Sequence, residues 1–302
     1  MNRRRVAALI VALALIAGIA GIIIHSNKSS QNTNGLQVVA AENFWGNIAQ
    51  QLGGPYVHVT SIITDPNADP HLYESSAKDA SEVASAKVVI VNGLGYDDFM
   101  NKLLGASNVS GRQVLTAQQI LQEPNGSNQH IWYNIPRVDE VAAQITNAYV
   151  AKDPAHKTAY QRNLVTFDQS LQPLLATINQ IKQTYGGTPV AYTEPVPGYM
   201  LEAAGLDVET PEGFAKSIED GTDPSPADAS TMDALMTNNS VKVLLYNAQA
   251  TSPVTEHVKT LADQAGIPVI GVTETLPANK TSYQSWMASE LQELQSALAE
   301  NK

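Results

Sequence analysis

The chain has 302 residues, enough for two lobes or one large α/β domain. Hydrophobic residues make up 43% and charged residues 16%, so a sizeable core is expected rather than disorder. The net charge of −11 argues against a nucleic-acid partner, which needs a basic surface, and the lack of cysteine excludes disulfides, thiolate metal ligands and cysteine nucleophiles.

The first 25 residues are predicted to direct export rather than to join the fold. Arginines at positions 3–5 precede an uncharged, apolar run at residues 6–24. Positive charge ahead of such a run keeps the amino end in the cytoplasm and places the rest of the chain outside. The run is just long enough to span a bilayer, so residues 1–25 are predicted to be an uncleaved membrane anchor, with a cleaved signal sequence as the alternative. The polar residues 26–35 are expected to form a flexible tether.

Residues 36–152 show an alternation of predicted strands and helices, which we interpret as an N-terminal lobe. Short β-branched segments predict four strands, at residues 36–41, 56–63, 84–91 and 113–115. The third ends in a continuous apolar run, which is typical of a buried parallel strand. Strands that alternate with helices imply βαβ units and therefore a parallel sheet.

A long helix is predicted at residues 155–185, within a linking segment at residues 153–186. Apolar residues recur there at alternating spacings of four and three: Tyr160, Leu164, Phe167, Leu171, Leu174, Ile178, Ile181 and Tyr185. Pro173 should kink this helix or cost it a hydrogen bond. A coiled-coil partner would fit the same pattern, but strand–helix alternation on both sides favours a single helix that joins two lobes.

Residues 187–302 repeat the scheme of the N-terminal lobe. Strands are predicted at residues 188–192, 206–209, 241–246 and 267–272, and residues 210–223 are expected to form a loop. The expected fold is α/β, with two Rossmann-like lobes that each hold a parallel four-stranded sheet and are joined by one long helix.

Four candidate metal ligands follow predicted strands, two in each lobe: His71, His130, Glu194 and Glu274. Open α/β sheets bind ligands at the carboxyl ends of their strands. Two imidazoles and two carboxylates suit a first-row divalent ion. Their intervals are too long for a zinc finger, so the pattern alone is also compatible with four unrelated loop residues. Asn247 and Gln249 could orient a ligand, but capping or loop hydrogen bonding is the favoured interpretation.

Several stretches resemble the metal-binding proteins of zinc and manganese ABC transporters, the cluster A-I family. They are Asn43-Phe44-Trp45 ahead of Gly53-Gly54, Asp69-Pro70-His71-x-Tyr73-Glu74, Val91-Asn92-Gly93-Leu94 and Gln129-His130-Ile131-Trp132. The resemblance runs from about residue 36 to the end. It implies that His71 and His130 are the metal ligands of the N-terminal lobe. Glu194 falls where zinc-type members have histidine and manganese-type members have glutamate, and Glu274 falls where the family usually has aspartate.

The resemblance implies an extracytoplasmic binding protein at the cell surface rather than an enzyme. Such a protein captures Zn²⁺ or Mn²⁺ between its lobes and delivers the ion to an ABC transporter permease in the membrane. We expect a monomer, and binding that weakens below about pH 6 as the histidines take up protons. The alternatives are a secreted metal-dependent hydrolase, for which no nucleophile elbow or His-Glu-x-x-His motif is present, and a surface adhesin-like protein with a structural metal site.

Overall fold

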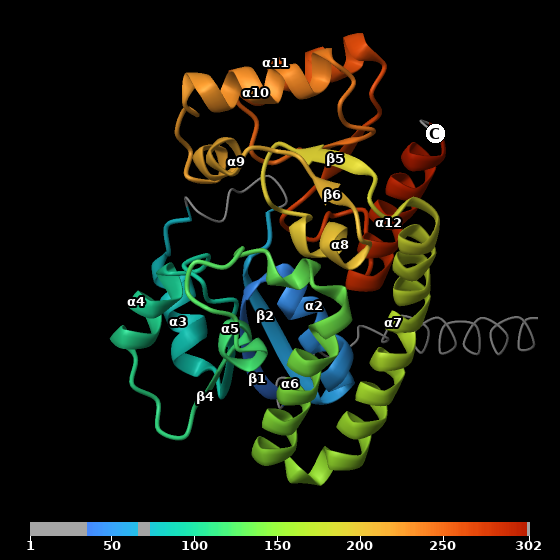
Figure 1. The fold of residues 1–302 in the computed structure, drawn as a ribbon. Helices are drawn as coiled ribbons and strands as arrows, with labels where there is room; N and C mark the ends of the chain where they lie inside the picture. Colours follow the sequence, from blue (N-terminus) through green and yellow to red (C-terminus); the bar gives the residue numbers. More distant parts are fainter. Residues whose placement is uncertain (1–34, 66–72, 301–302) are drawn as a thin grey trace, which may run out of the picture. The chain divides into compact units, whose positions relative to one another are not determined.

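Two parallel four-stranded sheets organise the computed structural model, which describes residues 35–65 and 73–300 (Figure 1). From Leu36 onward the chain forms one compact unit. The predicted export segment, nearly all of the predicted tether, and His71 lie outside the described residues. Within the described part, no helix combines the length and the apolar character that a membrane crossing needs.

The first sheet has the strand order β2-β1-β3-β4, with every neighbouring pair parallel. Its strands are β1 (Leu36–Glu42), β2 (Val57–Ile63), β3 (Val88–Val91) and β4 (Gln113–Thr116). Successive side chains of a strand point to opposite faces. Val38 therefore packs with one group of helices and Val39 with another, and both are buried. The helices of this N-terminal lobe are α2 (Asn43–Gly53), α3 (Ala77–Ser85), α4 (Phe99–Ala106), α5 (Ala117–Leu121) and α6 (Val138–Lys152).

The second sheet repeats the same topology, with the order β6-β5-β7-β8 and parallel neighbours. Its strands are β5 (Pro189–Tyr192), β6 (Asp207–Val208), β7 (Leu244–Asn247) and β8 (Val269–Val272). The helices of this C-terminal lobe are α8 (Gly198–Ala203), α9 (Glu212–Glu219), α10 (Pro226–Thr237), α11 (Pro253–Ala265) and α12 (Tyr283–Glu300). The predicted α/β class with two parallel four-stranded sheets is confirmed.

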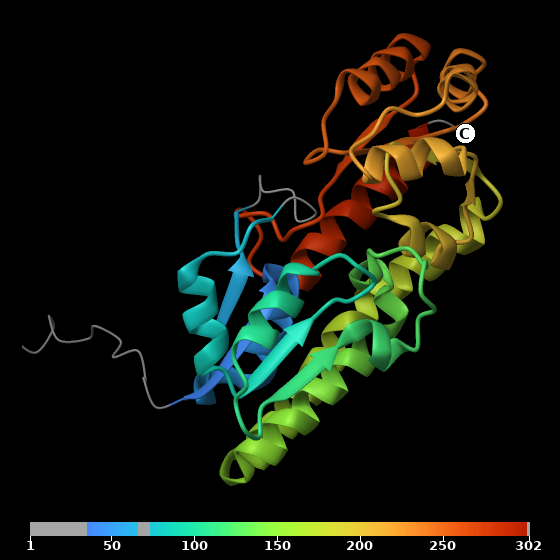
Figure 2. The ribbon, with the colours of Figure 1, turned by 90° about the vertical axis from the view of Figure 1, so that its left-hand side faces the viewer.

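Helix α7 (Lys157–Tyr185) connects the two lobes, as its apolar spacing predicts. It packs against α2 and α6 on one side of the connection and against α8 and α12 on the other (Figures 1 and 2). Pro173 lies inside the helix without ending it. The predicted apolar stripe is mostly buried, including Tyr160, Phe167 and Ile181. Most of the stability of this helix therefore comes from packing on both lobes.

The expectation of a loop across residues 210–223 is wrong, because α9 occupies Glu212–Glu219. Phe214, Ala215 and Ile218 are buried on one face of this helix. The segment offers only two turns between Pro211 and Gly221, too few for an apolar period to stand out in the sequence.

The two lobes are tied by direct hydrogen bonds as well as by α7. Asn43 on α2 donates to the carbonyl of Leu276 at 2.9 Å and accepts from its amide at 2.8 Å. The Tyr283 hydroxyl on α12 donates to the carbonyl of Trp132 at 2.7 Å. One continuous apolar core includes residues of both sheets and of α7. The loops of the two lobes thus face each other across a packed boundary.

Candidate metal site

Three of the four predicted ligands lie together in the structure. His130, Glu194 and Glu274 each offer one ligand atom, and these atoms all lie within 4.8 Å of one another. All three side chains are buried, with at most 1% exposed. Among residues 35–65 and 73–300, no other group of three or more acidic or histidine side chains is close enough to hold an ion. The fourth, His71, lies outside the described residues.

Each of the three residues follows a parallel strand. His130 comes in the connection after β4 and α5, Glu194 comes two residues after β5, and Glu274 comes two residues after β8. Figure 2 shows the strands of the first sheet pointing in one direction, so their carboxyl ends share one edge. Parallel strands bring loops from distant parts of the sequence to that edge. The sheets therefore position the cluster.

A cluster of aromatic side chains packs against the imidazole ring of His130. Trp132 has its ring centroid 5.2 Å from that of His130 and stacks on Phe44 at 4.1 Å. All three side chains are fully buried. The imidazole therefore has a rigid apolar wall on one side, which limits both its movement and the access of water.

Asn128 determines the tautomer of His130. Its Oδ1 lies 2.7 Å from Nδ1 of His130 and also accepts the His130 backbone N–H at 3.0 Å. Because an amide oxygen can only accept, Nδ1 carries the proton and Nε2 carries the lone pair. Nε2 lies 3.7 Å from Oε2 of Glu274. The imidazole thus presents its unprotonated nitrogen to the carboxylates.

Asn247 holds both glutamates, which corrects the favoured interpretation of it as a capping or loop residue. Its Nδ2 donates to Oε2 of Glu194 and, at 2.8 Å, to Oε1 of Glu274. Gln249 supports the same loop, because its Oε1 accepts the backbone amides of Glu274 and Thr275. Both residues orient the carboxylates of the cluster, and nothing in the sequence spacing distinguishes that task from capping.

Tyr96 is a site residue that the sequence did not suggest. Its hydroxyl donates to Oε2 of Glu274 at 3.1 Å, from a side chain that is 1% exposed. Burial, followed by the charge of Glu274, raises the pKa of Tyr96 well above its usual value, so the phenol stays protonated and remains a donor. Tyr96 lies in the N-terminal lobe, so this hydrogen bond crosses between the lobes.

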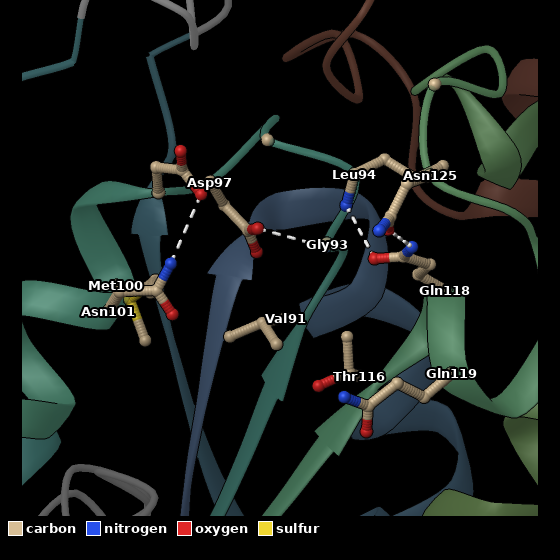
Figure 3. Close-up of a pocket in the computed structure, with 13 residues that line it drawn as sticks. Val91, Gly93, Leu94, Asp97, Met100, Asn101, Thr116, Gln118, Gln119 and Asn125 are labelled. Atoms are coloured by element: carbon tan, nitrogen blue, oxygen red, sulfur yellow. Dashed lines mark hydrogen bonds between the residues drawn. The ribbon is translucent and has the colours of Figure 1, made fainter.

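The loop that carries Tyr96 is held at both ends. Asp97 accepts the amides of Asn92 and Gly93 at 2.6 and 2.9 Å, and Gln118 accepts the amide of Leu94 at 3.0 Å. Leu94 has a positive φ of 60°, a conformation that costs a non-glycine residue energy and needs such support. Figure 3 shows the contacts of Asp97 with Gly93 and of Gln118 with Leu94 beside a cavity of about 390 Å³. None of the three described candidate ligands lines this cavity.

A second cavity, of about 530 Å³, reaches Glu194. Residues of both lobes line it, among them Gly95, Gln129 and the end of α9. Glu219 contributes a carboxylate with 6% of its side chain exposed, and its Oε1 lies 4.0 Å from Nδ1 of His130. This cavity therefore adjoins the cluster and has acidic walls.

The donor set fits a divalent first-row cation. One imidazole nitrogen and two carboxylates offer ligands of intermediate hardness, and two negative charges balance a 2+ ion. Two carboxylates in a dry site repel each other unless a cation or proton lies between them. A buried cluster of this composition is therefore suited to capturing an ion.

A comparison with protein families matches residues 38–297 to the family described as zinc-uptake complex component A, periplasmic. The manganese-binding lipoprotein MntA of Bacillus subtilis is 32% identical over 150 residues, covering 46% of this chain and 47% of that protein. The alignment thus spans about half the length of that relative. The manganese ABC transporter substrate-binding lipoprotein PsaA of Streptococcus pneumoniae is 25% identical over 90% of this chain and 91% of that protein.

Solved structures share the fold. The substrate-binding protein FpvC of Pseudomonas aeruginosa, in complex with Mn²⁺, superposes with a TM-score of 0.74 at 23% identity. The match covers 89% of this chain and all of that one. At this identity the likeness speaks for the fold alone.

Proposed function

The chain belongs to the family of the periplasmic zinc-uptake complex component A, and from this premise we propose that it captures Zn²⁺ or Mn²⁺ outside the cytoplasm for an ABC importer. The observation that carries the proposal is the buried cluster of His130, Glu194 and Glu274. We assign all three as ligands of the transported ion. His71 is proposed as the remaining ligand on the basis of the sequence pattern.

The position of the site supports the proposed delivery to a permease. The cluster draws its residues from both lobes, so an ion bound there favours the arrangement in which the lobes meet. A permease that binds this arrangement would distinguish the loaded from the empty protein. We propose that the protein acts as a monomer, with lobes at residues 36–152 and 187–302 and a linking segment at residues 153–186.

We propose binding rather than catalysis. A catalytic metal needs an open coordination position for water and substrate. Here Tyr96 and Asn247 hold the carboxylates, and aromatic rings cover the histidine. The hydrolase alternative gains no support from the named relatives, which are metal-binding and transporter proteins.

Metal analysis tests the proposal. Protein purified without added metal, then titrated with Zn²⁺ and Mn²⁺, is expected to bind one ion per chain. His130→Ala and Glu274→Ala should each lose most of that binding. His257→Ala is the matched control, because His257 is 55% exposed on α11 and faces Asp233 instead. Metal content that is the same in all four proteins would contradict the assignment.

Transport is tested in cells. Uptake of radioactive zinc or manganese by cells that lack the chain should be restored by the wild-type protein and not by His130→Ala. Restoration of uptake by both proteins would show that transport does not depend on the His130 cluster. Hydrolysis of esters, peptides or phosphates that tracks metal occupancy would favour the enzyme alternative.

A further inference from the structure

The orientation of the Asn247 side chain is determined by its neighbours. Its Oδ1 accepts the backbone amide of Gln249 at 2.9 Å, and its own backbone amide donates to Oγ1 of Thr193 at 3.0 Å. The residue is fully buried at the end of β7. Since Oδ1 is engaged by an N–H donor, Nδ2 must point the other way, towards the carboxylates.

The two protons of Nδ2 serve one carboxylate each. Glu194 accepts through Oε2 and Glu274 accepts through Oε1. We call this arrangement the Asn247 fork. A carboxylate that binds an ion through both oxygens must turn both towards it, and the fork holds one oxygen of each glutamate away. Each glutamate therefore offers the ion the oxygen that the fork does not hold, Oε1 of Glu194 and Oε2 of Glu274, and the second of these also accepts from Tyr96.

The fork thus limits the number of donor atoms. Among the described residues, His130 and two one-oxygen carboxylates give three donors, whereas two-oxygen binding by both glutamates would give five. Zn²⁺ is commonly four-coordinate in proteins, with nitrogen and oxygen ligands near a tetrahedron. Mn²⁺ favours octahedral, oxygen-rich surroundings.

We propose that Asn247 is a specificity-determining residue that restricts Glu194 and Glu274 to one donor oxygen each and so selects Zn²⁺ over Mn²⁺. This inference rests on the proposed function of the cluster. Zn²⁺ binds most sites more tightly than Mn²⁺ in any case, and the fork widens that difference. The restriction comes from a neutral amide, so it changes the geometry of the site without changing its charge.

The test compares the ratio of the dissociation constants for Mn²⁺ and Zn²⁺ in the full-length protein. Asn247→Ala removes the fork, and the ratio should fall about 10-fold, the scale on which groups that orient ligands act. Asn247→Ser retains a single hydroxyl proton, which can hold only one glutamate, and should give a smaller fall. Tyr96→Phe is the matched control, because it removes a hydrogen bond from Glu274 and leaves the fork intact. It should change both affinities by similar factors and the ratio by less than about twofold.

Co²⁺ provides a second readout, because its visible bands are intense in four-coordinate sites and weak in six-coordinate ones. We expect intense bands in the wild type and in Tyr96→Phe, and weaker bands in Asn247→Ala and Asn247→Ser. If Asn247→Ala does not fold, the ratio of dissociation constants measured for Asn247→Ser tests the inference instead. An unchanged ratio in a folded Asn247 variant that still binds Zn²⁺ overturns this inference and leaves the proposed function standing. A wild type that binds neither ion overturns both.

Discussion

Oη of Tyr133 lies 2.8 Å from Oε2 of Glu290 and 2.7 Å from the carbonyl oxygen of Thr273. One hydroxyl proton cannot serve both acceptors. A protonated Glu290 resolves this, because it donates to Oη while the hydroxyl donates to Thr273. Burial raises the pKa of Glu290 to about 8, which agrees with that arrangement. Since Thr273 precedes Glu274, a neutral carboxyl supports the loop that carries a proposed ligand.

Glu290→Gln should stabilise the protein at alkaline pH and change little at pH 5. The pKa of Glu290 is raised on folding, so between about pH 4.5 and 8 the unfolded chain releases a proton that the folded protein keeps. The contribution of Glu290 to stability therefore falls as pH rises through that window. Glutamine has no proton to lose and can still accept from Trp286, as Glu290 does at 2.7 Å. At pH 8.5 we expect a gain of roughly 3 kcal/mol in denaturant unfolding. Glu293→Gln on the same helix is the control. An equal gain in its stability would refute the assignment of a neutral Glu290.

Asn128→Ala should weaken Zn²⁺ binding by about 10- to 100-fold, as loss of a histidine's hydrogen-bond partner commonly does. Besides holding His130, Asn128 donates to the carbonyl of Pro195 at 2.6 Å, next to Glu194. Asn128→Asp keeps the acceptor for His130 and removes only this donor. Its loss of Zn²⁺ affinity should therefore be smaller than that of Asn128→Ala. The measurement is competitive titration with a chelator. Asn101→Ala, on the exposed surface of α4, is the control. Binding by Asn128→Ala at the wild-type affinity would show that a group other than Asn128 determines the tautomer of His130.

Trp132→Ala should lower the free energy of unfolding by about 3–5 kcal/mol, because it removes a fully buried indole that stacks on Phe44. Trp132→Phe retains part of the stack and should cost less. Val165→Ala provides the control, since Val165 is 55% exposed on α7 and should change stability by less than about 0.5 kcal/mol. Chemical denaturation measures all three. A loss below about 1 kcal/mol for Trp132→Ala would mean that the aromatic wall is not rigid.

Glu219→Gln should slow metal association, by about threefold at low salt, and leave dissociation nearly unchanged. Glu219 and Glu194 line the same cavity, so a cation that reaches Glu194 through it passes the carboxylate of Glu219. High salt should remove the difference. Stopped-flow mixing with Zn²⁺ measures the rates. Glu212→Gln, at the exposed other end of α9, should leave the association rate unaltered. Equal association rates for Glu219→Gln and wild type would exclude this route.

Prediction from sequence succeeded where a single local pattern carries the information. The run Val88–Val91 indicates a buried strand by itself, and the spacing from Tyr160 to Tyr185 indicates α7. His130, Glu194 and Glu274 could be selected because their chemistry is distinctive and each follows a strand. That they meet within 4.8 Å is a result of the parallel topology, which brings the carboxyl ends together.

Other features depend on contacts that no local pattern reveals. Asn247 has the same sequence appearance as a capping residue, and only the position of both glutamates shows its role. Glu42 is a clearer case: burial and the nearby Asp97 raise its pKa well above the usual value, yet in sequence it simply precedes α2. Burial likewise raises the pKa of Asp97 to about 6. Neither carboxyl stands out in the sequence, because the environment of a charge is a property of the folded chain.

The position of Glu274 in the chain determines when the cluster can form. It follows β8, the last strand, and is bonded to Tyr96 and Asn247, which lie 178 and 27 residues earlier. A ribosome must synthesise the chain as far as Glu274 before these groups can meet. An unfolded chain has the residues of the cluster but not the cluster itself. Under the proposed function, loading with metal therefore follows both the synthesis and the folding of the two lobes.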